Sequence, residues 1–139
     1  MTDKMLIDTN ILVYAYGKSE PKHEIAATRL KEAIGSGKAT LSNQNLAEFS
    51  SVMTQKLGAE SSHAELRKIV EWLSKTTEVI GYDPESVLLA LKISEKENIH
   101  FFDSLLIATM TQKGIGTIMT ENEKDFQIQG ITIVNPFKT

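Results

Sequence analysis

Short apolar segments alternate with longer segments of helical periodicity along the chain, and this alternation narrows the possible folds more than any other feature. Each apolar segment has only three or four residues, which is typical of strands buried on both faces of a parallel sheet. Parallel strands need long connections, usually helices, so we predict a three-layer α/β/α domain with a central parallel five-stranded sheet. The expected strands are 5–7, 39–41, 78–80, 117–119 and 131–134.

Residues that favour helix ends separate these segments. Pro21 is expected to open the second helix, because the missing proline N–H is not needed in a first turn. Ser62 and Glu65 match a capping box, and Asp83 followed by Pro84 predicts an N-cap and a first helical position. The helices expected from these signals are 11–16, 21–34, about 44–57, 63–73, 84–96 and 105–110.

The composition is that of one globular domain, and we expect residues 1–139 to form it. Hydrophobic residues make up 41% and charged residues 24%, which argues against disorder. No apolar run approaches the roughly 20 residues that span a bilayer, and no signal-peptide pattern is present. We therefore expect a cytoplasmic protein without membrane contact. The absence of cysteine excludes disulfides, thiolate zinc sites and a cysteine nucleophile.

Asp8 interrupts the first apolar segment at its carboxyl end, where a buried strand is expected to stop. Burial of a carboxylate at the tip of such a strand raises the free energy of the folded state unless a positive charge lies nearby. Ligands of open parallel sheets bind outside the carboxyl ends of the strands. Glu48, Asp103, and the pair Asn122 and Asp125 are expected to approach that same edge from separate parts of the chain.

Each acid also has an ordinary structural interpretation. Asp8 alone could form an Asx-turn, and Glu48 could lie at the border of a helix's apolar face. Asp103 could be an N-cap, and Asp125 could be a solvated loop residue. The prediction of a site rests on the four residues together.

Repulsion among these acids indicates what would stabilise such a site. Two carboxylates about 5 Å apart repel by roughly 3 kcal/mol at an effective dielectric constant of about 20. Either some are protonated or cations bind, and an oxygen-only site suits Mg²⁺ or Mn²⁺. The net charge of −3 argues weakly against a broad nucleic-acid-binding surface, but bound cations would reverse the local sign. Sites of this kind commonly catalyse phosphoryl chemistry.

Four segments resemble the ordered acidic motifs of PIN-domain nucleases, and their order and spacing cover essentially the whole chain. They are Met5–Leu12, Asn45–Phe49, Phe102–Ala108 and Thr120–Phe126. The resemblance implies a Mg²⁺-dependent endoribonuclease, with Mn²⁺ able to substitute, and is greatest for VapC-type toxins. It also implies an RNA substrate, a cognate antitoxin protein and a homodimer.

The same resemblance implies roles for individual residues. Asp8, Glu48 and Asp103 would be the metal-binding and catalytic acids, while Asn10 and Thr120 would support the site by hydrogen bonds. Asn122 stands where many members have aspartate, and Asp125 could supply the missing acid as a further catalytic residue. The alternative hypothesis is a non-catalytic PIN-like module that binds RNA or protein, which the neutral Asn122 and the acidic net charge favour.

Overall fold

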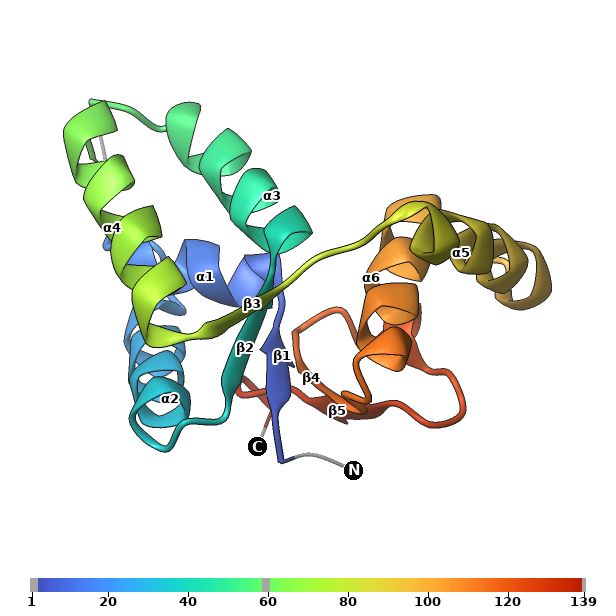
Figure 1. Cartoon of the computed structure of the whole chain (residues 1–139). Coiled ribbons are helices and arrows are strands. Elements are labelled where there is room, and N and C mark those ends of the chain that lie inside the picture. Colours follow the sequence, from blue (N-terminus) through green and yellow to red (C-terminus); the bar gives the residue numbers. More distant parts are fainter. Residues whose placement is uncertain (1–2, 59–60, 139) are drawn as a thin grey trace.

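The computed structural model describes residues 3–58 and 61–138, and an all-parallel five-stranded sheet lies at its centre (Figure 1). This confirms the predicted fold class. The strands lie in the order β3-β2-β1-β4-β5. Their bounds are β1 Met5–Ile7, β2 Ala39–Ser42, β3 Glu78–Ile80, β4 Thr117–Met119 and β5 Thr132–Val134.

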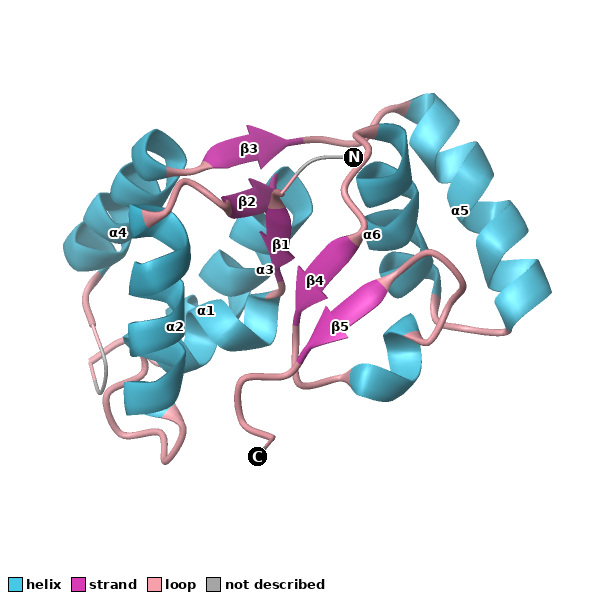
Figure 2. Ribbon diagram, turned by 90° about the horizontal axis from the view of Figure 1, so that it is seen from below, coloured by secondary structure: helices cyan, strands magenta, loops and turns pink. Residues whose placement is uncertain are grey.

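Helices cover both faces of the sheet, as the view along the layers shows (Figure 2). One face packs against α1 Thr9–Tyr16, α2 His23–Gly35, α3 Asn43–Thr54 and α4 His63–Thr76. The other face packs against α5 Pro84–Glu97, α6 Phe101–Gln112 and the short 3-10 helix η1 Glu123–Phe126. Within the described residues, no helix is both long and apolar enough to cross a membrane.

Strand β1 is the centre of the packing because its side chains alternate between the two cores. Ile7 joins the core beneath α1 to α4, whereas Leu6 joins the core beneath α6 and η1. Both residues are fully buried. Such a strand must be apolar on both faces, which explains why residues 5–7 are a continuous apolar run.

The chain reverses its direction of travel across the sheet beside β1. It passes from β1 to β2 and β3 on one side, and later places β4 and β5 on the other side. Leu6 pairs with Thr40 of β2 and with Ile118 of β4. A crevice is expected at the carboxyl ends of β1 and β4, because connections leave this point in opposite directions.

Two of the predicted helix starts are confirmed, and two are wrong. The N-caps Ser62 and Asp83 are confirmed, since each accepts a hydrogen bond from a backbone N–H of the first turn. The start expected at Pro21 is wrong, because α2 begins at His23. Helix α6 begins at Phe101, four residues before the expected start, because Phe101 packs against the core cluster beneath α5. Tertiary packing therefore outweighs the weak local signal there.

Candidate functional site

Asp8 marks the transition from β1 to α1. Its backbone N–H donates to Met119 O at 3.0 Å, which continues the pairing with β4. Its side chain is then the N-cap of α1, and Oδ1 accepts from Thr9 N at 2.8 Å. Only 8% of the residue is exposed. The sequence break after Ile7 thus fixes a buried carboxylate at the carboxyl end of the central strand.

Polar side chains from α1 and from the end of β4 surround the second oxygen of this carboxylate. Asp8 Oδ2 accepts from Thr120 Oγ1 at 2.8 Å and from Asn10 Nδ2 at 3.3 Å. Thr120 Oγ1 accepts in turn from Asn10 Nδ2 at 3.1 Å and from Asn122 N at 3.0 Å. Asn10 and Thr120 therefore lie where they orient the Asp8 carboxylate.

Glu48 comes from α3 and is joined to Asp8 through Thr9. Thr9 Oγ1 donates to Glu48 Oε1 at 3.1 Å and accepts from Asn45 Nδ2 at the same distance. Asn45 is fully buried, and its Oδ1 accepts from the N-cap residue Ser42. Reasoning from the sequence gave Thr9 and Asn45 no individual role. The available signal was the position of Asn45 three residues after Ser42, where a capping-box partner belongs.

Asp103 lies in the first turn of α6, so the expectation that it could be an N-cap is wrong. His100 occupies that position, without a side-chain capping hydrogen bond. Asp103 instead lines a cavity of about 510 Å³ together with Asp8, Glu48, Asn10 and Asn122. Three acids from separate parts of the chain therefore share one cavity, at the carboxyl ends of β1 and β4.

Asn122 and Asp125 occupy different places around the cavity. Asn122 is exposed and belongs to the cavity wall, just before η1. Asp125 is half-buried within η1 and is not among the residues that line this cavity. Its charge nevertheless acts on Asp103 and raises the pKa of that carboxyl. Asn122 thus contributes an amide at the rim of the cavity, and Asp125 contributes a negative charge that acts on Asp103 from outside the cavity lining.

Burial and neighbouring charges raise the pKa of two acids of the cavity, Asp8 and Asp103. Burial raises the pKa of Asp8 to about 6; the hydrogen bonds from Thr120 and Thr9 oppose this rise, while the charges of Asp103 and Glu48 add to it. Burial also raises the pKa of Asp103, and the charges of Asp125 and Glu48 increase that effect, while His100 opposes it. A cation in the cavity would favour the ionised form of both acids.

The donor set fits a hard divalent cation in chemistry. The acids offer only oxygen atoms, which Mg²⁺ and Mn²⁺ prefer over softer metals. In the described part of the chain, no group of three Asp, Glu or His side chains lies close enough together to hold one ion. The side chains of Glu48 and Asp103 would therefore have to move toward Asp8 on binding a shared ion.

A second cluster stands beside the acids and was not predicted from the sequence. Glu121 Oε1 accepts from Tyr14 OH at 2.5 Å, and Glu121 Oε2 forms an ion pair with Lys22 Nζ at 2.5 Å. Lys22 Nζ also lies 5.0 Å from the centre of the Phe137 ring. The hydrogen bond to Glu121 raises the pKa of Tyr14 to about 12. Because Glu121 N donates to Asn10 Oδ1, this cluster fastens α1 to the end of β4.

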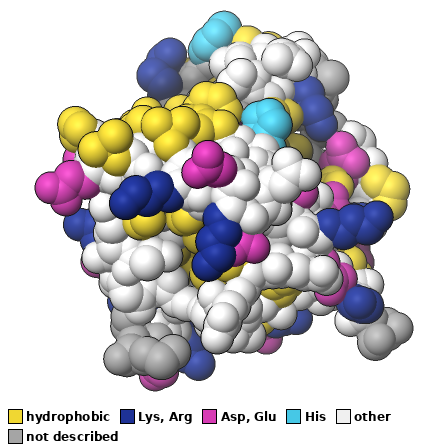
Figure 3. Space-filling model, turned by 90° about the vertical axis from the view of Figure 1, so that its right-hand side faces the viewer, with side chains coloured by type: hydrophobic (Ala, Val, Ile, Leu, Met, Phe, Trp, Pro, Cys, Tyr) yellow, Lys and Arg dark blue, Asp and Glu magenta, His cyan; other side chains and the backbone are white. Residues whose placement is uncertain are grey.

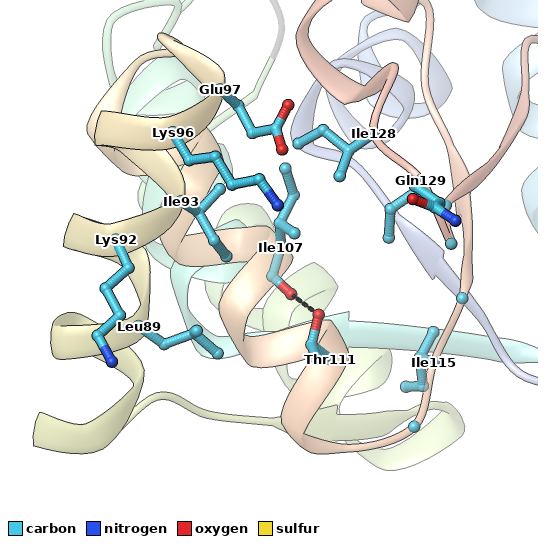
Figure 4. Close-up of a pocket in the computed structure, with 14 residues that line it drawn as sticks. Leu89, Lys92, Ile93, Lys96, Glu97, Ile107, Thr111, Ile115, Ile128 and Gln129 are labelled. Atoms are coloured by element: carbon cyan, nitrogen blue, oxygen red, sulfur yellow. Dashed lines mark hydrogen bonds between the residues drawn. The ribbon is translucent and has the colours of Figure 1, made fainter.

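A larger cavity of about 630 Å³ lies at the other end of the sheet (Figure 4). Its walls include residues 114–116, which precede β4, and residues 128–131, which precede β5. Figure 4 shows the aliphatic side chains of Ile93, Ile107 and Ile128 around it, with Lys96 and Glu97 at one rim. It lacks a cluster of acids, and it lies away from the topological reversal, so the smaller cavity is the candidate site.

Comparisons with known proteins agree with this assignment of the fold. The PIN domain family model matches residues 5–129. VapC20 of Mycobacterium tuberculosis, a sarcin-ricin loop cleaving toxin, is 17% identical over 93% of this chain and 99% of that chain, with a TM-score of 0.70. A toxin-antitoxin complex from Klebsiella pneumoniae is 19% identical over 98% of this chain and 100% of that chain, with a TM-score of 0.68.

A third structure is VapBC2 of Rickettsia felis bound to a fragment of its promoter DNA. It is 20% identical over 94% of this chain and 97% of that chain, with a TM-score of 0.69. At these identities, the likeness to solved structures shows a shared fold and nothing beyond it. A comparison with curated protein sequences found no match. The family model covers strands β1 to β4 and the acids of the cavity, and because it matches most of the chain, the chain belongs to the PIN domain family.

Proposed function

We propose that this protein is a Mg²⁺- or Mn²⁺-dependent endoribonuclease that acts as the toxin of a toxin–antitoxin pair. The observation that supports this most is the meeting of Asp8, Glu48 and Asp103 in one cavity at the reversal of the sheet. Proteins of this fold include a toxin that cleaves the sarcin-ricin loop and members of toxin-antitoxin complexes. The whole chain would act as one domain in the cytoplasm, as a homodimer, with an antitoxin protein as partner.

Asp8, Glu48 and Asp103 would hold the cation, and Asn10 and Thr120 would orient Asp8 for it. The chemistry that a bound divalent cation supplies is Lewis acidity, which activates water and neutralises charge on a phosphodiester. Asp8 Oδ1 accepts from Thr9 N, and Oδ2 accepts from Thr120 and Asn10, so these hydrogen bonds fix the orientation of the carboxylate. Asn122 would position water or phosphate at the rim through a neutral amide, while Asp125 keeps a negative charge behind Asp103.

The experiment is a cleavage assay on a structured RNA with EDTA, Mg²⁺ or Mn²⁺ in separate reactions. Cleavage should require the cation, and Asp8→Asn or Asp103→Asn should abolish it. Asp83→Asn is the matched control, because Asp83 caps α5 outside the cavity and asparagine is also a good N-cap. Equal cleavage by the wild type and both cavity variants would contradict the proposal.

A non-catalytic PIN-like module is the second candidate. The neutral Asn122 at the cavity rim favours it, and so does the spacing of the acids in the described residues, which is too wide for one ion. It predicts that Mn²⁺ leaves the melting temperature unchanged and that no RNA is cleaved. A rise of several degrees that is lost in Asp8→Asn would argue against this candidate.

A further inference from the structure

The cavity that Asp8, Glu48 and Asp103 line is called the acid cavity. A second cavity, of about 490 Å³, adjoins it, and Glu48 lines both. It lies between the start of α3, the segment that joins β3 to α5, and the first turn of α6. Buried Leu105 lies at its inner side. Its volume is within the range of about 300–1,000 Å³ that is usual for small-ligand sites.

Two aromatic side chains stand at this cavity with much of their surface in solvent. Tyr82 is 45% exposed and Phe102 is 51% exposed, so neither is explained by burial in the core. Phe102 is held by an edge-on contact with Phe101, whose ring centre is 5.4 Å away. Among the described residues, no ring contact joins Tyr82 to Phe102. Two exposed rings that line one cavity form a surface on which a planar ligand can stack.

Side-chain amides complete the wall between the two rings. The Asn43 amide packs against Gly81, where an added Cβ would lie 3.0 Å from Asn43 Nδ2. Gln44 is 9% exposed, and its Nε2 donates to Phe102 O at 2.9 Å. Its Oε1 is buried and has no hydrogen-bond partner in the described part of the chain. A buried acceptor without a donor is unfavourable, and a ligand N–H would satisfy it once the Gln44 amide turns toward the cavity.

We propose that this second cavity binds one nucleobase of the RNA, next to the phosphate that lies at the acid cavity. The inference rests on the proposed function. Stacking on aromatic rings and hydrogen bonding to an unpaired base edge are the usual means of recognising single-stranded RNA. Tyr82 and Phe102 stack the base, while the amides of Asn43 and Gln44 contact its edge. The shared Glu48 places the base and the phosphate on neighbouring surfaces.

A second copy of the chain is the competing occupant. The face that includes α5 shows hydrophobic side chains gathered in its upper part (Figure 3), and Leu88 and Leu91 of α5 are 63% and 54% exposed. These leucines are not among the residues that line the second cavity. The amides and the unpartnered Gln44 Oε1 favour a polar planar ligand over an apolar protein surface, and the leucines provide a matched control.

The experiment has a binding arm and a cleavage arm. Adenosine, guanosine, cytidine and uridine are titrated against the full chain, because nucleosides lack the phosphate that the acid cavity would bind. Short single-stranded RNAs that differ at one base beside the scissile bond are then cleaved with Mg²⁺. We expect Tyr82→Ala and Phe102→Ala each to weaken the preferred nucleoside about tenfold and to reduce the preference among the RNAs. Tyr82→Phe keeps the ring and should retain both, and Leu88→Ala should change neither.

Three results would overturn the base-binding proposal. One is unchanged nucleoside binding in both alanine variants. Another is an unchanged preference among the RNAs. The last is dissociation of a dimer by Tyr82→Ala and Phe102→Ala, measured by sedimentation, with base preference intact, which would assign this surface to a second copy. If the wild type cleaves no RNA but the alanine variants still lose nucleoside binding, the base-binding cavity is supported and the nuclease proposal fails.

Discussion

Asp8→Asn should stabilise the metal-free protein more at high pH than at low pH, relative to the wild type. Burial raises the pKa of Asp8 from 3.8 to about 6, so the folded state prefers the protonated carboxyl. A raised carboxyl pKa contributes stability below the unfolded pKa, and this stability is lost as the pH rises through the folded pKa. The full shift corresponds to about 3 kcal/mol, of which about 2 kcal/mol is lost between about pH 4.5 and 8. Asparagine cannot ionise, so the variant is spared this loss.

Urea unfolding with EDTA at about pH 4.5, 6 and 8 measures the effect as a difference between variant and wild type. Replacement of the carboxyl group by an amide also changes the local hydrogen bonding by about 1 kcal/mol, so the slope with pH, rather than the difference at one pH, is the decisive quantity. The control is Asp83→Asn, because hydrogen bonds from Ser86 hold the pKa of Asp83 below its usual range. Its stabilising effect is lost only as the pH falls below about 4, so the difference for Asp83→Asn should be nearly independent of pH between about pH 4.5 and 8. A pH-independent difference for Asp8→Asn would refute the reasoning.

Other predictions concern the groups around the site. Thr120→Val removes the donor to Asp8 Oδ2 and should raise the pKa of Asp8 above about 6, measured by NMR titration of the carboxyl carbon. Glu121→Gln removes the charged acceptor of Tyr14 OH and should lower the pKa of Tyr14 from about 12 toward its ordinary value, seen in a difference ultraviolet titration. Asn45→Ala leaves buried partners unsatisfied and should cost about 1–3 kcal/mol in urea unfolding; a cost near zero would show that Asn45 is dispensable.

The sequence alone was sufficient to locate the inner strands β1 and β4, because each is a short, mainly apolar run between helices. Burial on both faces requires this pattern, so residues 5–7 and 117–119 could be located without coordinates. The N-caps Ser62 and Asp83 could also be predicted from the sequence, because capping depends on residues that are neighbours in the chain. The start of α6 was not, since it depends on how Phe101 packs against residues distant in the sequence.

For the site, the sequence by itself determined which side chains could be involved. Asp8 breaks an apolar strand, and Glu48 and Asp103 lie in helices that were expected to approach the same edge of the sheet. Tertiary structure decided the rest, because hydrogen bonds and burial join residues far apart in the chain. Thr120 reaches Asp8 across 112 positions, and Asn45 reaches Thr9 across 36. The pKa of Asp8 and the cavity beside Glu48 arise only when those segments pack together, because desolvation and shape depend on every neighbour at once.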